Sequence, residues 1–349
     1  MEKLILIITA LLLIARFEAT GALADTIRIG DQRSFESGRF LNEGIKFLKL
    51  NQSTEAIKQF DLALDVFSEN ALALYNRGVA KLNQKDLEGA IADFDKAIKY
   101  YAEMPLWYLA RGKALSELFD FEGAQKDFEK AIELQPANYL GWYHRGEMWF
   151  LRGEFDRAVQ DFSRAIELQP DFAPAWNDRG SARQMTGNLT GAATDFQRAL
   201  VLDPSMYFTF NNMGSLRNQQ RQYTEAIEFF TTAIWLNSNY ETAYSNRGVA
   251  RFNLELYQEA IADYTSAIAL NPAFALAFNN RANARYKLGD FEGALADFDQ
   301  AIALNPAFAE AYLNRGIVRE MLRDNEGATN DWEKALELGL TVAEGYLKN

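Results

Sequence analysis

A period of 34 residues constrains this chain more than any other feature of its sequence. The stretch Ala275–Phe308 shows the pattern, because it reads as two amphipathic helices, about Leu276–Leu288 and Phe291–Leu304. A Gly-Asp turn separates them, and Asn305-Pro306 ends the second, since proline cannot extend a helix. One such hairpin cannot bury its own apolar faces, so it needs neighbours of its own kind.

Those neighbours follow at the same spacing, without insertion or deletion. The nine repeats are 37–70, 71–104, 105–138, 139–172, 173–206, 207–240, 241–274, 275–308 and 309–342. The eighth place is glycine in every repeat but one, where Ala282 stands. The twentieth and twenty-seventh places are always alanine, and the twenty-fourth is always aromatic, from Phe60 to Trp332. Small residues let two helices approach closely, and the aromatic rings fill the space around them.

On these residues the chain resembles a tetratricopeptide-repeat (TPR) protein from Ser37 to Val342. The proline near the end of each repeat is present in five of the nine. The resemblance implies an all-α fold, a right-handed TPR superhelical solenoid of nine helix-turn-helix repeats that forms one quasi-linear domain. Polar Thr329 and Asn330 in the last repeat are typical of a terminal cap, and 343–349 is a C-terminal stub of at most two helical turns.

Residues 1–24 precede the repeats and predict a cleaved export signal. Leu4–Ala15 is apolar throughout, and a small-x-small cleavage pattern precedes Asp25. The alternative is an uncleaved membrane anchor, but Arg16 ends the run short of the ~20 apolar residues that a span needs. We therefore expect an exported protein (periplasmic, lumenal or extracellular), with a membrane as partner only if the segment is retained. For the polar lead-in, 25–36, no structure is predicted.

Composition excludes several classes of function. The net charge of −12 and the absence of a basic run argue against nucleic acid as a partner. The chain has no cysteine, which excludes disulfides and thiolate metal sites. It has one histidine, His144, and none of the HExxH, GxGxxG or P-loop motifs. We expect no enzyme activity, no cofactor and no bound metal.

Two places of the repeat vary together. The seventh is arginine and the twenty-third is aspartate in the same seven repeats: Arg77–Asp93, Arg111–Asp127, Arg145–Asp161, Arg179–Asp195, Arg247–Asp263, Arg281–Asp297 and Arg315–Asp331. The other two repeats have lost both, as Glu43 with Gln59 and Met213 with Phe229. Co-variation of this kind predicts a contact, here within each repeat. The alternative is that the arginines form a groove-facing ladder that binds anions.

The resemblance also implies that the second, fifth, sixth, ninth, twelfth and thirteenth places of each first helix line a concave groove. The sixth place holds Asn42, Asn76, Asn212, Asn246, Asn280 and Asn314. A side-chain amide has both a donor and an acceptor, so it matches a peptide group whatever the side chains are. The series resembles the asparagine ladder by which a TPR superhelix holds a peptide backbone. The alternative is that these asparagines cap or bridge neighbouring helices.

Aromatic residues complete the predicted groove. Tyr143 and Phe150 fall on inward places beside His144 and make a candidate apolar anchor pocket. The lysine that a chaperone-tail clamp needs at the fifth place is absent. We therefore expect a non-catalytic protein–protein interaction scaffold that binds extended protein segments, in complex assembly or chaperone-like escort outside the cytoplasm. The alternative is a binder of envelope glycan or lipid that uses the aromatic pocket.

Overall fold

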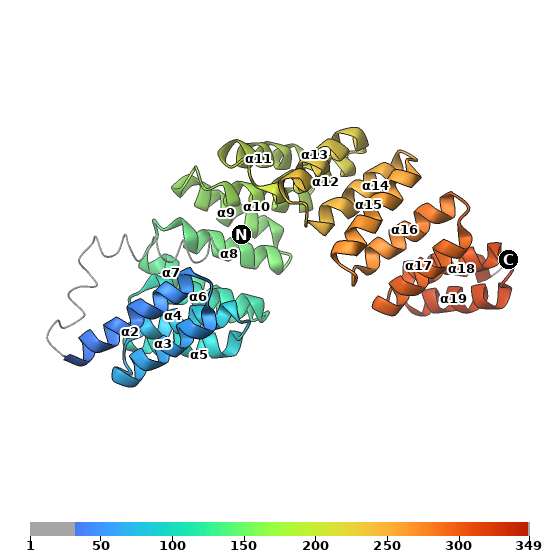
Figure 1. Ribbon diagram of the computed structural model, residues 1–349. Coiled ribbons are helices and arrows are strands. Elements are labelled where there is room, and N and C mark those ends of the chain that lie inside the picture. Colours follow the sequence, from blue (N-terminus) through green and yellow to red (C-terminus); the bar gives the residue numbers. More distant parts are fainter. Residues whose placement is uncertain (1–31, 348–349) are drawn as a thin grey trace. The chain divides into compact units, whose positions relative to one another are not determined.

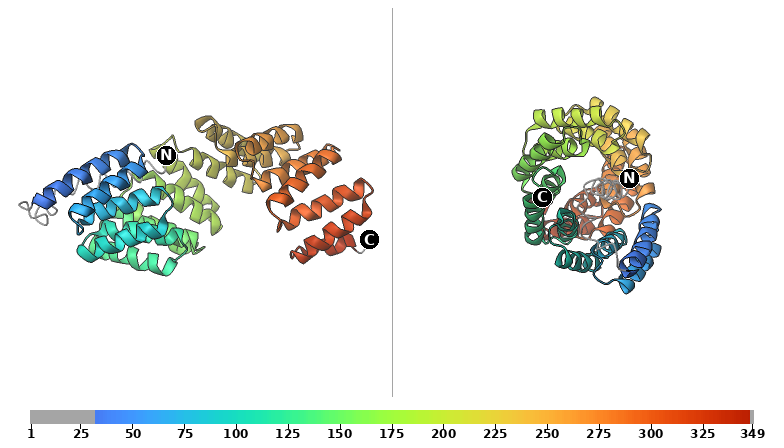
Figure 2. Two further views of the ribbon diagram at one scale, coloured as in Figure 1. Left: turned by 60° about the horizontal axis from the view of Figure 1, so that its bottom comes forward. Right: turned by 90° about the vertical axis from the view of Figure 1, so that its left-hand side faces the viewer.

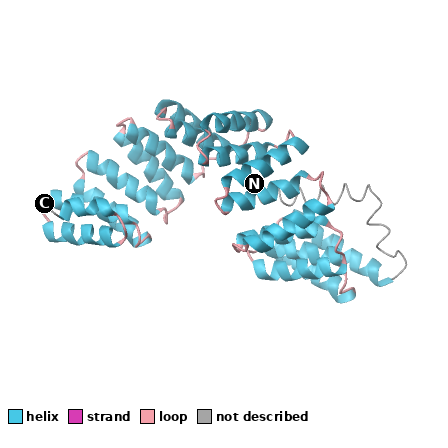
Figure 3. Ribbon diagram, turned by 180° about the vertical axis from the view of Figure 1, so that it is seen from behind, coloured by secondary structure: helices cyan, strands magenta, loops and turns pink. Residues whose placement is uncertain are grey.

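The computed structural model describes residues 32–347, and every regular element within that range is a helix (Figure 3). The described residues divide into two units, 32–182 and 183–347, with the division inside α10 (Ala173–Met185). Within each unit the helices form hairpins that follow one another in chain order (Figures 1 and 2). The all-α repeat fold is thus confirmed, whereas the expected export signal at 1–24 lies outside the described residues.

The first unit contains four complete hairpins and most of α10. Its helices are α2 (Gln32–Lys49), α3 (Ser53–Val66), α4 (Ala71–Asn83), α5 (Leu87–Tyr100), α6 (Pro105–Glu117), α7 (Phe121–Leu134), α8 (Tyr139–Leu151) and α9 (Phe155–Leu168). Because α2 begins at Gln32, the end of the lead-in is helical. Ser37 ties α2 to its hairpin partner α3 by donating from its hydroxyl to the carbonyl of Ala63 at 2.7 Å.

The second unit continues with the same alternation of helices. They are α11 (Leu189–Leu202), α12 (Tyr207–Gln219), α13 (Tyr223–Leu236), α14 (Glu241–Asn253), α15 (Tyr257–Leu270), α16 (Ala275–Lys287), α17 (Phe291–Leu304), α18 (Ala309–Met321) and α19 (Asn325–Glu337). A 3-10 turn, Thr341–Ala343, and the short α20 (Glu344–Leu347) follow. The bounds of α16 and α17 agree with the two predicted helices to within one residue.

The turn inside each hairpin requires one residue with left-handed backbone. At the fifteenth place Gly289 has φ +80° and Gly153 has φ +81°, which glycine adopts without steric cost. In other repeats the same place is held by a residue with a side chain, such as Glu255 with φ +62°. Such a residue is strained there, because its Cβ approaches the following carbonyl.

The next residue caps the second helix. Asp290 accepts a hydrogen bond from the backbone N–H of Gly293 at 3.0 Å, which satisfies one of the free donors at the start of α17. A Cβ at Gly293 would collide with that carboxylate, so the cap and the glycine belong together. The same pairing holds at Asp86, Asp120, Asn188 and Asp324.

The two helices of a hairpin touch at the eighth and twenty-fourth places. A Cβ added at Gly78 would lie 2.5 Å from the ring of Phe94, and one at Gly248 would lie 2.6 Å from the ring of Tyr264. The fully buried alanines of the twentieth and twenty-seventh places surround these rings. The core is therefore a series of clusters, each built by neighbouring repeats, as a solenoid requires.

The first helices of successive repeats also contact one another. In the first unit α4 meets α6 and α6 meets α8, and in the second unit α14 meets α16 and α16 meets α18. In each unit the first helices therefore form one continuous surface, which we call the first-helix face.

Candidate functional site

The arginines of the seventh place are held by aspartates, not free for anions. Nε of Arg281 donates to Oδ2 of Asp297 at 2.8 Å, and Nη2 donates to Oδ1 at 2.7 Å. Asp297 is 3% exposed, so the pair lies in the packing between α16 and α17. The same contact joins Arg77–Asp93, Arg111–Asp127, Arg145–Asp161, Arg247–Asp263 and Arg315–Asp331. The predicted pairing is confirmed in these six repeats, whereas Arg179 and Asp195 of the seventh pair belong to different units.

Each arginine also reaches back to the preceding repeat, which the sequence did not predict. Nη1 of Arg315 donates to Asp299 at 2.7 Å, and Nη1 of Arg281 donates to the hydroxyl of Thr265 at 3.0 Å. The twenty-fifth place supplies the acceptor in both cases. Aspartate, threonine and serine can all accept this hydrogen bond at the twenty-fifth place. The residue type there therefore does not co-vary with the arginine of the seventh place.

A second cation completes several of these pairs. The eleventh place is basic in six repeats, and Arg285 donates to Oδ2 of Asp297 at 2.9 Å. The equivalent contacts are Lys81–Asp93, Arg183–Asp195, Arg251–Asp263 and Arg319–Asp331. In repeat three the eleventh place is Leu115, and there burial raises the pKa of Asp127 above its usual 3.8 despite Arg111.

The predicted asparagine ladder divides into bonded and open members. Asn76 is 5% exposed, and its amide donates to the carbonyl of Leu72 in its own helix at 2.7 Å, which corrects its assignment to the groove. Asn246 donates to Asn211 of the preceding repeat at 3.0 Å, so it bridges two first helices. Asn280 accepts from its neighbour Asn279 at 3.3 Å. Asn212 is half-buried and takes part in a further contact.

Two predicted members have open amides. Asn42 is exposed on α2, and Asn314 is half-buried on α18; neither amide bonds within the described chain. Asn314 lines a cavity that is described below.

The predicted anchor at Tyr143 and Phe150 is not an open pocket. Tyr143 is 8% exposed, its ring lies 5.0 Å from that of Phe172, and its hydroxyl donates to Asp178 at 2.6 Å. Phe150 packs on Phe155 with ring centres 5.3 Å apart. Tyr143 is thus a packing residue between repeats four and five. The fifth place is buried in every repeat except the ninth, where Leu313 is half-buried, so Tyr143 does not face an open groove as expected.

His144 belongs to a small polar cluster on α8. Its Nδ1 lies 2.5 Å from Oε2 of Glu147, one turn along the same helix. Burial lowers the pKa of His144 below 6.5, and the positive charge of Lys113 acts in the same direction. Burial opposes ionisation of Glu147, but His144 and Lys113 outweigh it and lower its pKa. At neutral pH we therefore expect a neutral imidazole that donates to an ionised carboxylate.

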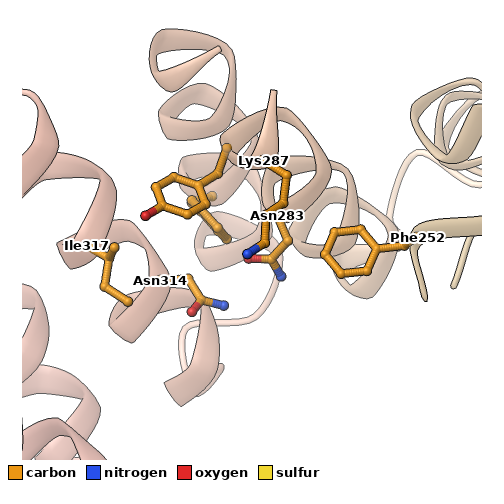
Figure 4. A pocket seen from close by; sticks show the side chains of 7 residues that line it. Phe252, Asn283, Lys287, Asn314 and Ile317 are labelled. Carbon is orange, nitrogen blue, oxygen red and sulfur yellow. The ribbon is translucent and has the colours of Figure 1, made fainter. Parts of the chain in front are cut away.

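A cavity of about 370 Å³ opens on the first-helix face of the second unit (Figure 4). It is lined by Phe252, Asn283, Tyr286, Lys287, Phe298, Asn314 and Ile317. Except for Phe298 of α17, these residues come from the first helices α14, α16 and α18 and occupy the sixth, ninth, twelfth and thirteenth places. The places that the resemblance assigns to the groove thus meet in one cavity.

The cavity combines apolar walls with polar groups that have no partner. Figure 4 shows the amides of Asn283 and Asn314 directed into it from two helices, with Phe252 and Ile317 on either side. Within the described residues neither amide makes a hydrogen bond, and the ammonium of Lys287 makes no ion pair. Of the predicted site residues only Asn314 lies here. The other cavity residues on the first helices could have been predicted from their places in the repeat, because the ninth, twelfth and thirteenth places were already assigned to the groove.

Other kinds of site find no support in the described residues. No group of three or more histidine, aspartate or glutamate side chains in residues 32–347 is arranged to hold a metal ion. Over the same range, none of the helices combines the length and apolar character needed to cross a bilayer.

Comparison with known families identifies the repeat. Models of the tetratricopeptide repeat match residues 41–105, 109–173, 152–207 and 242–274, and a further TPR-repeat model matches 282–322. The chain belongs to the tetratricopeptide-repeat family. TPR proteins are generally non-catalytic scaffolds that bind other proteins or peptides, so the fold indicates a protein–protein interaction scaffold.

Two solved structures with TM-scores above 0.5 support the TPR fold. A chain of the APC/C hetero-tetramer Cut9–Hcn1 is 16% identical, with a TM-score of 0.61 over 98% of this chain and 82% of that one. A tetratricopeptide-repeat protein from Parabacteroides merdae is 20% identical, with a TM-score of 0.55 over 69% of this chain and 96% of its own. MamA is 26% identical over 47% of this chain and 96% of its own, with a TM-score of 0.43. No curated protein matches the sequence.

Proposed function

We propose that this TPR protein is a non-catalytic scaffold that binds an extended protein segment along its first-helix face. The observation that carries the proposal is the cavity around Asn283 and Asn314, where two open amides face an apolar-walled space. A peptide group offers one donor and one acceptor, and so does each amide. An extended segment therefore finds hydrogen-bond partners for its backbone and an apolar surface for its side chains.

Further amides on groove places support this reading. Nδ2 of Asn83, Oδ1 of Asn218 and Oδ1 of Asn279 are buried and make no hydrogen bond within the described chain. Asn83 and Asn218 stand at the thirteenth and twelfth places, which the resemblance assigns to the groove, whereas Asn279 stands at the buried fifth place. A buried amide atom without a partner costs roughly 1–3 kcal/mol, so a partner that supplies the missing bond gains that amount.

We also propose that the scaffold works outside the cytoplasm, in assembly or escort of protein complexes. The apolar stretch at Leu4–Ala15 and the cleavage pattern before Asp25 support export. Intact-mass measurement of protein recovered from its native host tests this part. A chain that begins at Asp25 is expected; a full-length chain in the membrane fraction would contradict cleavage and favour the anchor.

Binding itself is tested with displayed peptides and matched variants. Purified protein is panned against a library of twelve-residue peptides, and the affinity of selected peptides is measured by fluorescence anisotropy. The test variant combines Asn283→Val with Asn314→Ala. Each new residue already occurs at the same place of another repeat, valine in repeat seven and alanine in repeat three. Two lost hydrogen bonds of about 0.5–1.5 kcal/mol each predict a roughly 5- to 150-fold weaker Kd.

The control variant carries Gln300→Ala and Asn330→Ala, two exposed amides on the second helices α17 and α19. It is expected to bind like the unmodified protein. Equal affinity in the test variant, with helix content unchanged by circular dichroism, would remove the cavity from the binding surface.

A further inference from the structure

Lys287 differs from the other basic residues on the first helices of the second unit. On α12, α14, α16 and α18 every arginine has a carboxylate within ion-pair distance. The ammonium of Lys287, in the wall of the cavity, has no such partner among the described residues. Lys287 is exposed, and among the basic residues of these four helices it alone lacks a carboxylate partner within residues 32–347. Its charge is available to a ligand.

The groups around Lys287 suit a carboxylate in particular. The amides of Asn283 and Asn314 each carry two N–H donors, and Figure 4 shows both directed into the space beside Lys287. A carboxylate accepts several hydrogen bonds through its two oxygens, and such charge-assisted bonds are stronger than neutral ones. The cavity thus offers one positive charge and a set of donors for one negative group.

We propose that the cavity selects an acidic side chain, aspartate or glutamate, from the bound segment, with an apolar neighbour placed against Phe252 and Ile317. This inference rests on the proposed peptide-binding function and adds the chemistry of the partner. A phosphate group carries close to two negative charges at neutral pH, and the single charge of Lys287 leaves one of them uncompensated.

The surroundings limit the segment to one acidic residue at this point. Glu320 lies one turn beyond Ile317 on α18, and Glu310 precedes Asn314 on the same helix; both are exposed. Like charges repel, so a run of acidic residues along α18 is disfavoured. The expected partner is a mostly uncharged, apolar segment with an isolated carboxylate.

The test compares two peptides that differ in one atom group. A selected twelve-residue peptide is made with glutamate or with the isosteric glutamine at the central acidic position, acetylated and amidated so that neither end is charged. With the unmodified protein the glutamate peptide is expected to bind about tenfold more tightly, and its advantage falls at high salt because the attraction is screened.

Matched variants assign the effect to one side chain. Lys287→Asn introduces the residue type found at the equivalent place of repeat seven, Asn253. In this variant the two peptides are expected to bind equally. Lys49→Asn changes the thirteenth place of repeat one, far along the sequence from the cavity, and is expected to keep the tenfold difference. Circular dichroism confirms that both variants are folded.

The outcomes separate the two proposals. Equal binding of the glutamate and glutamine peptides to the unmodified protein would overturn the acidic selection while the scaffold function stands. Binding of neither peptide nor any library member would remove the scaffold function itself. Tighter binding of a phosphoserine peptide, or binding that needs a free carboxyl terminus, would overturn the assignment to an acidic side chain.

Discussion

Arg281 donates two parallel hydrogen bonds of 2.8 and 2.7 Å to the carboxylate of Asp297. Nη1 of Arg285 donates a third hydrogen bond of 2.9 Å to the same carboxylate. One buried aspartate therefore compensates two arginines whose side chains are 13% and 26% exposed. The bidentate geometry aligns α16 with α17 at a fixed register. Removal of the aspartate leaves both cations without that carboxylate.

The variant Asp297→Ala is expected to destabilise the second unit by about 3 kcal/mol, the lower end of the cost of breaking a buried pair. Asp299→Ala on the same helix is the control, because Asp299 is 49% exposed and bonds only to the outer side of Arg315. It is expected to cost about 0–1 kcal/mol. Urea unfolding of both variants measures the difference, and equal losses would show that burial does not set the cost.

In repeat six the Arg–Asp pair is absent, so its contribution can be tested by introducing it. It has Met213 and Phe229 where other repeats have arginine and aspartate, yet it keeps Arg217 at the eleventh place. Met213→Arg alone buries a guanidinium without its carboxylate and is expected to cost about 3 kcal/mol. Adding Phe229→Asp supplies the carboxylate between two arginines, so the double variant is expected to recover at least ~1 kcal/mol of coupling. Additive losses in the double-mutant cycle would rule out the contact in this repeat.

His144 predicts a dependence of stability on pH. Its pKa is lowered in the folded state by burial and Lys113, so the unfolded chain binds more protons near pH 6.5. Its contribution to stability is therefore present above pH 6.5 and is lost as pH falls from 6.5 towards the lowered value. Because no other histidine exists in the chain, His144→Gln is expected to flatten the unfolding free energy between pH 7 and 5. An unchanged slope in that variant would place the titration elsewhere.

The strained turn residue Glu255 offers a gain in stability. It adopts φ +62°, where glycine stands in three other repeats. Glu255→Gly removes a left-handed strain of about 1–2 kcal/mol and adds roughly 0.5–1 kcal/mol of unfolded-state entropy, so a net gain of about 1 kcal/mol is expected. Glu255→Ala keeps the Cβ and is expected to give no gain. Thermal unfolding of the two variants measures the difference, and equal stabilities of Glu255→Gly and Glu255→Ala would contradict the prediction.

The repeat fold was predictable because each constraint recurs. Glycine at the eighth place, an aromatic residue at the twenty-fourth and alanine at two others record the same close approach in every hairpin. The Arg–Asp pair was predictable for the same reason, since both partners are lost together. The N-cap pair of Asp290 with Gly293 also recurs, and a search for co-variation at those places would have found it.

The candidate site was harder to predict, because groove residues differ from repeat to repeat. Asn283 and Tyr286 each occur once at their places, and lysine recurs at the thirteenth place only as Lys49, so no column marks these residues. The asparagines of the sixth place do form a column, but recurrence there reflects mixed roles. Asn76 bonds within its own helix, whereas Asn314 opens into the cavity.

The backward reach of the seventh-place arginines has a consequence for the order in which the protein is made. Arg281 donates to Thr265 and Arg315 donates to Asp299, in each case sixteen residues earlier in the chain. A ribosome completes the acceptor before it adds the donor. Each new hairpin can therefore bond to a preceding repeat that has already been synthesised. Within each unit, the repeats can stack in order from the amino-terminal side during synthesis.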